Sequence, residues 1–291
     1  MSDRRLTPAN GRVAALRLRG QVAAASFVAG VAAAVARPQA FLHAAPHGPR
    51  DRELIFGDAV TVYERRGGWA FVESAKDGYC GYVAEAALGA PVDADHAVAV
   101  RQTHLYPAPD LKRPPLLALP YGARLRRVTE GKTTGATGAT GGGAAGWVAV
   151  AAGGWRGMVP ESHLRPLVTP APDRVAEAER FLGTPYLWAG NTGWGIDCSG
   201  LVQVSALAAG LACPGDSDLQ EQVVGTALAP DAAPRRGDLV FWKGHVAIMA
   251  DDTRLLHANA HAMAVAYEGY ADACARISAQ GGGEVTTRRR V

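Results

Sequence analysis

Two segments in the first half of the chain share one pattern of hydrophobic and polar positions. Apolar and polar residues alternate over four to six positions, broken by Gly, Asp and Pro, in residues 56–88 and again in 121–164. Three parts of the first copy match the second: Gly57 with Gly122, Trp69 with Trp147, and Glu85–Leu88 with Glu161–Leu164. Such alternation is typical of short antiparallel strands. The repeat therefore predicts two small all-β barrels, at 37–90 and 96–167, with a Gly/Thr-rich loop at 131–145 that cannot form a core.

The periodicity changes after the Pro-rich linker at 166–172. Segments Asp173–Leu182 and Asp197–Ala209 carry apolar residues at helical spacing, and each begins with an aspartate that can cap a helix. Three strand patterns follow, at Asp238–Trp242, His245–Ala250 and Arg254–Ala258. Helices followed by an antiparallel meander predict an α+β domain over residues 173–291.

The N-terminal segment, residues 1–36, has two interpretations. Its run Val22–Ala36 is preceded by arginines and ends in small residues, as in a secretory signal. The run contains no leucine, however, and its polar leader argues for a buried strand or helix of a cytoplasmic protein. At about 15 residues it is too short to span a bilayer. We expect a cytoplasmic protein without a membrane span, with a periplasmic or secreted protein as the alternative.

The composition excludes several classes of protein. Lys and Arg number 30 against 27 Asp and Glu, a net charge of +3 that does not indicate a nucleic-acid binder. The one dense basic run, Arg288–Arg290, is expected to form a solvated tail. Four cysteines in 291 residues do not make a disulfide scaffold.

Cys198 is the one cysteine whose sequence surroundings suit a nucleophile. It directly follows Asp197, the predicted helix cap, and the N–H groups at a helix start stabilise a thiolate and lower its pKa. A thiolate that attacks a carbonyl still needs a proton donor for the leaving amine. His245 and His257, on consecutive predicted strands, supply such a partner and a residue that orients it. The other cysteines are interpreted as structural: Cys80, Cys213 and Cys274.

A zinc site is the alternative use of these side chains. It would add His261 to the cysteine and the two histidines, but the spacing fits neither C-x-x-C nor H-E-x-x-H. We therefore expect no metal and no other cofactor.

Four motifs, in this order, resemble the NlpC/p60 cysteine peptidases: Gly183-x-Pro185-Tyr186-x-Trp188, Asp197-Cys198-Ser199-Gly200, Gly237–Phe241 and Gly244–Ile248. Members of that family have a papain-like fold and cut bacterial cell-wall peptides. The resemblance implies Cys198 as nucleophile, His245 as general base and acid, and His257 as the orienting residue. It also implies that Tyr186 lies near the oxyanion. One departure is Ala189, where the family usually has glycine.

Tandem SH3 domains before such a domain resemble the γ-D-glutamyl-diamino acid endopeptidases. In that subgroup the first SH3 domain narrows the groove, so that only peptides with a free N-terminal L-Ala fit. A buried amine requires carboxylates and hydroxyls around it. The candidates here are Asp197, Ser199, Asp216 and Ser217, with Tyr79 and Asp58 from the first SH3-like repeat. Gly215 stands where the family often has an arginine.

The resulting hypothesis is a cysteine endopeptidase that hydrolyses the γ-D-Glu–diaminopimelate (or Lys) bond of murein peptides during cell-wall peptide recycling. The murein peptide is the expected partner, and no protein partner is predicted. A secreted hydrolase of intact peptidoglycan, with the SH3 domains as wall-binding modules, is the alternative enzyme. A binding protein with an inactive catalytic domain and an acyltransferase of similar fold also remain open.

Overall fold

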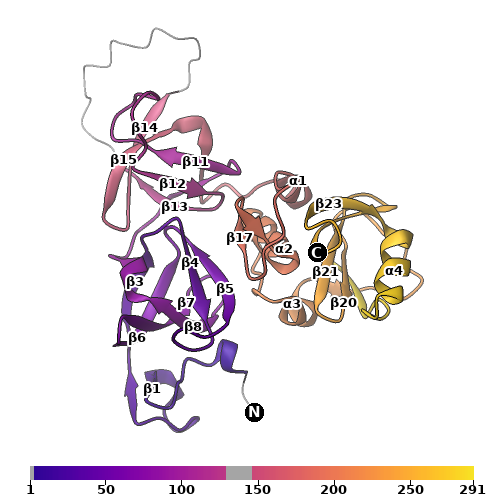
Figure 1. Cartoon of the computed structure of the whole chain (residues 1–291), viewed down its shortest axis with the longest axis horizontal. Helices are drawn as coiled ribbons and strands as arrows, with labels where there is room; N and C mark the ends of the chain where they lie inside the picture. Colours follow the sequence, from indigo (N-terminus) through magenta and orange to yellow (C-terminus); the bar gives the residue numbers. More distant parts are fainter. Residues whose placement is uncertain (1–2, 129–145) are drawn as a thin grey trace.

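The computed structural model describes residues 3–128 and 146–291, so the predicted loop at 131–145 lies outside the described residues. The described residues form two all-β domains and an α+β domain (Figure 1), which confirms the predicted fold class. Strand β17 (Asn191–Thr192) and helix α2 (Cys198–Ala208) of the third domain face the β-domains. The helix that begins at Cys198, the predicted nucleophile, therefore lies on the side of the third domain that meets the first two.

The first β-domain is a sheet with strand order β5-β4-β8-β7-β6-β3-β9. In chain order its elements are β3 (Val31–Val35), β4 (Gln39–His43), β5 (Arg50–Ile55), β6 (Ala59–Arg66), β7 (Trp69–Ser74), β8 (Cys80–Ala84), the 3₁₀ turn η3 (Glu85–Ala87) and β9 (Leu88–Gly89). The inward members of the alternating pattern, among them Leu42, Val62 and Val72, form its core. Strand β3 lies before residue 37, so the sheet includes part of the N-terminal segment.

The segment ahead of this sheet is folded onto it. It contains η1 (Arg4–Leu6), β1 (Val13–Ala15), η2 (Leu16–Leu18) and β2 (Ser26–Val28), and β1 pairs with β2 in parallel. The run Val22–Ala36 thus holds β2 and β3, and β3 pairs with β6 and β9. Its residues Ala33–Val35 are buried in the domain core. Of the helices in the described part of the chain, none is long and apolar enough to cross a membrane.

The second β-domain repeats the same turns on a five-stranded sheet and a separate two-stranded sheet. Its elements are β10 (His96–Val98), β11 (Gln102–Leu105), β12 (Leu117–Pro120), β13 (Arg124–Arg127), β14 (Trp147–Ala152), β15 (Trp155–Pro160), η4 (Glu161–His163) and β16 (Leu164–Pro166). The matched glycines Gly57 and Gly122 both have a positive φ, 81° and 79°. The matched segments at 85–88 and 161–164 each begin with a 3₁₀ turn. The two copies therefore share local structure as well as sequence.

The α+β domain packs helices on both faces of an antiparallel sheet with strand order β19-β24-β20-β21-β22-β23. Its elements are α1 (Arg174–Glu179), β17, β18 (Gly195–Ile196), α2, α3 (Ser217–Val223), β19 (Thr226–Ala227), β20 (Leu239–Trp242), β21 (His245–Met249), β22 (Arg254–Asn259), β23 (Ala264–Gly269), α4 (Tyr270–Ala279) and β24 (Thr287–Arg290). Phe181 and Leu201 pack on one face of β21 with Val246 and Ile248. Helix α4 covers the other face with Ala273 and Ile277.

The predicted helices and strands of this domain match the structure closely, but the predicted tail was wrong. Arg288–Arg290 lie in β24, which pairs with both β19 and β20. Backbone pairing at a sheet needs no particular side chain, and Arg290 is held by Asp238 at 2.7 Å. A charged run can therefore form an ordered strand.

Candidate active site

Cys198 is the first residue of α2, as the motif predicts. Asp197 caps the helix, because its Oδ1 accepts a hydrogen bond of 2.6 Å from the Gly200 N–H. Its Oδ2 accepts from the N–H of Ala189 at 2.9 Å, which fixes the preceding turn. The thiol is buried among the core residues that join α2 to β21. The cap and the turn together set the position of the sulfur.

The protonation state of this thiol differs from the sequence-based prediction. Burial raises the pKa of Cys198 to about 12, and the Asp197 carboxylate adds to the rise. The backbone N–H groups of Val246 and Ser199 and the charge of Arg52 act in the opposite direction but do not outweigh burial. The free enzyme therefore holds a neutral thiol, and an adjacent base must take its proton.

The structure joins the two predicted histidines directly. Nε2 of His245 on β21 and Nδ1 of His257 on β22 are 2.9 Å apart. His245 directly precedes Val246, whose N–H forms a hydrogen bond with the Cys198 sulfur. The imidazole and the thiol therefore belong to one site. Burial lowers the pKa of both histidines, and the proximity of His257 lowers the pKa of His245 further. Both rings are neutral near pH 7, as a general base must be.

Tyr186 lies beside the nucleophile. It is half-buried and packs against the core cluster that contains Cys198. Its turn is anchored by a hydrogen bond of 2.9 Å from its N–H to the Met263 carbonyl. Burial raises the pKa of Tyr186, and the proximity of Cys198 and Asp197 adds to the rise. The phenol therefore stays protonated and can donate a hydrogen bond.

A buried arginine from the first β-domain completes the polar surroundings of the helix start. The Arg52 side chain, on β5, is only 2% exposed, and one of its terminal nitrogens lies 3.2 Å from Asp197 and 3.1 Å from Ser199 Oγ. The other donates to Asn191 Oδ1 at 2.7 Å. A Cβ on Gly215 would lie 3.0 Å from Arg52 Nε. Arg52 thus fills the space beside residue 215, where the family often has an arginine.

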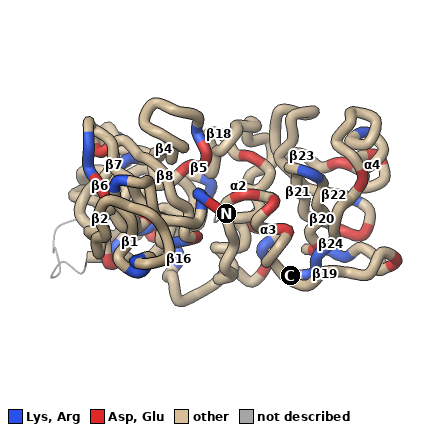
Figure 2. The backbone as a smooth tube through the Cα atoms, turned by 90° about the horizontal axis from the view of Figure 1, so that it is seen from below, with Lys and Arg blue, Asp and Glu red and all other residues tan. Residues whose placement is uncertain are grey.

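Asp216 and Tyr79 meet across the domain boundary. The Tyr79 hydroxyl, from the first β-domain, donates to Asp216 Oδ2 at 2.9 Å. The same oxygen accepts from Arg5 of the N-terminal segment at 2.7 Å, and Arg5 also binds Asp218. Figure 2 shows the N-terminus beside α2 and α3, where these charges gather. Ser217 follows Asp216 as the half-buried first residue of α3.

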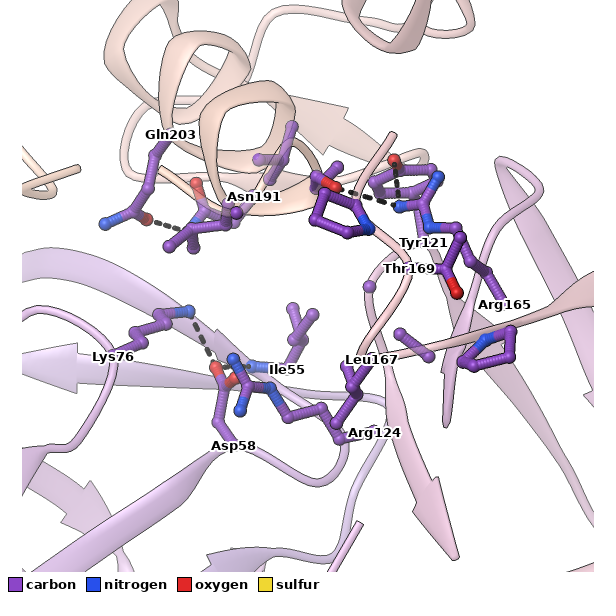
Figure 3. Close-up of a pocket in the computed structure, with 18 residues that line it drawn as sticks. Ile55, Asp58, Lys76, Tyr121, Arg124, Arg165, Leu167, Thr169, Asn191 and Gln203 are labelled. Carbon is purple, nitrogen blue, oxygen red and sulfur yellow. Dashed lines mark hydrogen bonds and ion pairs between the residues drawn. The ribbon is translucent and has the colours of Figure 1, made fainter. Parts of the chain in front are cut away.

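Asp58 lies apart from this group. Its carboxylate accepts from the Ile55 N–H at 2.9 Å and from Lys76 Nζ at 2.6 Å. It lines a cavity of about 90 Å³ between the three domains. Figure 3 shows Asn191 and Gln203 on the opposite wall. The contacts of Asp58 therefore stabilise a turn of the first β-domain.

Two family models match the chain. That of the NlpC/P60 family matches residues 183–276, and that of the bacterial dipeptidyl-peptidase Sh3 domain matches residues 42–88. The matched regions contain the Cys198 helix with both histidines, and the strand that carries Arg52. Residues 183–276 are thus an NlpC/P60 cysteine-peptidase domain, and a bacterial dipeptidyl-peptidase SH3 domain precedes it.

Individual relatives agree with this assignment. The chain is 26% identical over 237 residues to dipeptidyl-peptidase 6 of Lysinibacillus sphaericus, covering 75% of this chain and 84% of that protein. It is 36% identical over 95 residues to γ-D-glutamyl-L-lysine dipeptidyl-peptidase of Bacillus cereus, covering 30% of this chain and 28% of that protein. A crystal structure of an NlpC/P60 family protein from Bacillus cereus superposes with a TM-score of 0.71, at 21% identity, over 89% of this chain and 99% of that one. That similarity shows that the arrangement of all three domains recurs as a fold.

The NlpC/P60 site has the groups that acyl transfer requires. It offers a nucleophile, a neutral imidazole and hydrogen-bond donors beside the sulfur. Among residues 3–128 and 146–291, no cluster of His, Cys, Asp or Glu side chains is arranged to hold a metal ion. The nucleophile, the imidazole and the donors support nucleophilic attack with proton transfer.

Sequence reasoning missed three residues of this site: Arg52, Arg5 and Glu268. The first two reach the NlpC/P60 domain from other parts of the chain. For Arg52 one signal was available, since the glycine at 215 left the family's arginine unaccounted for. Glu268 accepts from His257, and its strand was not predicted.

Proposed function

We propose that this NlpC/P60 peptidase hydrolyses the γ-D-Glu–diaminopimelate (or Lys) bond of short murein peptides that begin with a free L-Ala, in cell-wall peptide recycling. The relatives support this proposal, because two of them are named for dipeptide release and one for the γ-D-glutamyl-L-lysine bond. Similarity along most of the chain, SH3-like part included, also favours a shared substrate class.

The observation that carries the proposal is the Asp216 carboxylate. It lies at the boundary between the first β-domain and the NlpC/P60 domain, held by Tyr79 of the former. It already binds a cation, the Arg5 guanidinium, at 2.7 Å. A carboxylate so placed can hold the ammonium group of L-Ala, which would take the place of Arg5. In an NlpC/P60 site this limits the substrate to peptides with a free amine.

Acylation begins with proton transfer from Cys198 Sγ to Nδ1 of His245. The sulfur attacks the γ-carbonyl carbon of D-Glu, and the carbonyl oxygen becomes an oxyanion. Backbone N–H groups at the start of α2 and the Tyr186 hydroxyl donate to that oxygen. Nδ1 of His257 accepts a hydrogen bond from Nε2 of the His245 imidazolium and so holds that ring in place.

The intermediate collapses when the C–N bond breaks. The leaving amine of the diamino acid takes the proton from Nδ1 of His245 and departs, leaving L-Ala-γ-D-Glu as a thioester on Cys198. His245 then removes a proton from water, which attacks the thioester carbon. The dipeptide leaves with a new carboxyl group, and the thiol regains its proton.

Replacing the nucleophile tests this mechanism. Cys198→Ala should lower turnover of L-Ala-γ-D-Glu-diaminopimelate by at least about 10³-fold, because no other group forms the thioester. Cys274→Ala, a half-buried cysteine on α4, is the matched control and should keep wild-type turnover. Product masses from quenched reactions give both rates, and activity retained by Cys198→Ala would refute the mechanism.

The same assay separates recycling from wall hydrolysis. For a cytoplasmic recycling enzyme, we expect free tripeptide to be cut far faster than intact sacculi. Removal of residues 1–36 as a signal peptide would take β3 out of the first sheet. This supports the interpretation of Val22–Ala36 as part of the folded domain. Equal rates on sacculi and tripeptide would favour the secreted alternative.

A further inference from the structure

The hydrogen bonds of the active site continue beyond His257. The Nε2 of His257 lies 3.0 Å from Oε2 of Glu268, on the neighbouring strand β23. Glu268 is held by Arg276 of α4, with contacts of 2.7 Å to Nε and 2.8 Å to a terminal nitrogen. His257 is buried, 1% exposed, so water does not replace these contacts. The chain of contacts therefore runs from His245 through His257 to an ion pair.

The charge on Glu268 fixes the direction of each hydrogen bond. Hydrogen bonds from Arg276 hold the pKa of Glu268 below its usual value, so the carboxylate only accepts. His257 must then carry its proton on Nε2, and in a neutral ring its Nδ1 is an acceptor. The bond between the two rings consequently runs from Nε2–H of His245 to Nδ1 of His257. This leaves the lone pair of His245 on Nδ1.

We infer that Glu268 is a positioning residue that sets the tautomers of His257 and His245, so that Nδ1 of His245 is the base that receives the Cys198 proton. The inference rests on the proposed role of His245. Without an acceptor at Glu268, His257 can carry its proton on Nδ1 and donate to His245 instead. His245 would then hold its own proton on Nδ1, where it cannot act as a base.

The same contacts act when His245 becomes charged. Its imidazolium forms in a buried site, packed against the Trp242 ring at 5.7 Å between centroids. His257 accepts from the imidazolium and donates to a carboxylate, so a negative charge faces the new positive one through a single ring. Arg276 and His261 oppose this effect at His257, and Glu268 is the acid that supports it.

Nitrogen-15 NMR of the histidine side chains tests the tautomers in the wild-type protein. His245→Gln and His257→Gln variants assign the two signals. We expect both rings to be protonated on Nε2 and unprotonated on Nδ1 near pH 7. A proton on Nδ1 of His245 would overturn the inference, and this result does not depend on what the enzyme cleaves.

Kinetics of Glu268 variants provide the second test. Glu268→Leu should lower kcat on the tripeptide roughly 10- to 100-fold, with KM changed by less than about twofold, because fewer His245 rings are free to accept a proton on Nδ1 while the substrate contacts stay the same. Glu268→Gln keeps an amide oxygen that accepts from His257 and should lose less. Glu284→Leu, which removes a carboxylate bonded only to Ser278 among the described residues, is the control and should match wild type.

The outcomes separate positioning from a structural role. A lower kcat accompanied by a proton on Nδ1 of His245 in Glu268→Leu supports the inference. An unchanged kcat, or a lower kcat with the wild-type tautomers, overturns it. A proton on Nδ1 of His245 in the wild-type spectrum overturns the inference whether or not Glu268→Leu folds. The proposed function fails separately, through activity of Cys198→Ala.

Discussion

Ala189 holds a backbone conformation that favours glycine. Its φ is +65°, in the left-handed region, and it stands where the family usually has glycine. The turn needs this conformation because the Ala189 N–H donates to Asp197, the residue that caps the nucleophile helix. The alanine therefore costs backbone energy at the residue whose N–H holds Asp197, the cap of the nucleophile helix.

Ala189→Gly should stabilise the protein. Relief of the left-handed strain, about 1–2 kcal/mol, exceeds the entropy that glycine loses on folding, and a net gain of about 1 kcal/mol corresponds to a Tm rise of roughly 2–4 °C. Thermal denaturation measures this change. Ala206→Gly, in the middle of α2, is the control of opposite sign and should lower the Tm. A lower Tm for Ala189→Gly would contradict the strain argument.

Arg52 on strand β5 forms an ion pair with Asp197, the cap of helix α2, although the two residues are 145 positions apart in the sequence. The guanidinium neutralises a carboxylate that both caps α2 and raises the pKa of Cys198. The first β-domain thus supplies a positive charge to the NlpC/P60 site.

Arg52→Met should damage both stability and catalysis. Leaving Asp197 buried without its partner costs about 3–5 kcal/mol, and the uncompensated charge disfavours thiolate formation. We expect a lower Tm and a kcat/KM on the tripeptide reduced at least roughly tenfold. Arg50→Met, on the same strand but stacked over Phe41, is the matched control and should leave kcat/KM unchanged. Equal kcat/KM for Arg52→Met and wild type would remove Arg52 from the site.

These elements show what the sequence could predict. Helical spacing and the Asp-Cys-Ser-Gly motif predicted α2 within one residue at each end, and strand patterns predicted that His245 and His257 would be neighbours. Periodicity reports only local order, so it did not predict that β5 would insert Arg52 beside α2. Glu268 was missed for a related reason: its strand β23 was not predicted, so nothing placed this acid beside His257.

At the scale of the whole molecule, the N-terminal segment and the first β-domain both contact the NlpC/P60 domain at Asp216. The N-terminal segment packs on the first β-domain through Arg4 and Asp51 and reaches Asp216 through Arg5, 211 residues away. The first β-domain contributes Tyr79 to the same carboxylate. Three separate parts of the chain therefore meet at the place proposed for the substrate amine, and no local sequence pattern could predict this meeting.

The most direct test of this account compares L-Ala-γ-D-Glu-diaminopimelate with the same tripeptide acetylated on the L-Ala nitrogen. Acetylation removes the positive charge and adds bulk where Asp216 and Tyr79 meet. The account predicts release of L-Ala-γ-D-Glu from the free tripeptide and a kcat/KM at least roughly 100-fold lower for the acetylated one. Equal kcat/KM for the two peptides would contradict recognition of a free amine at Asp216.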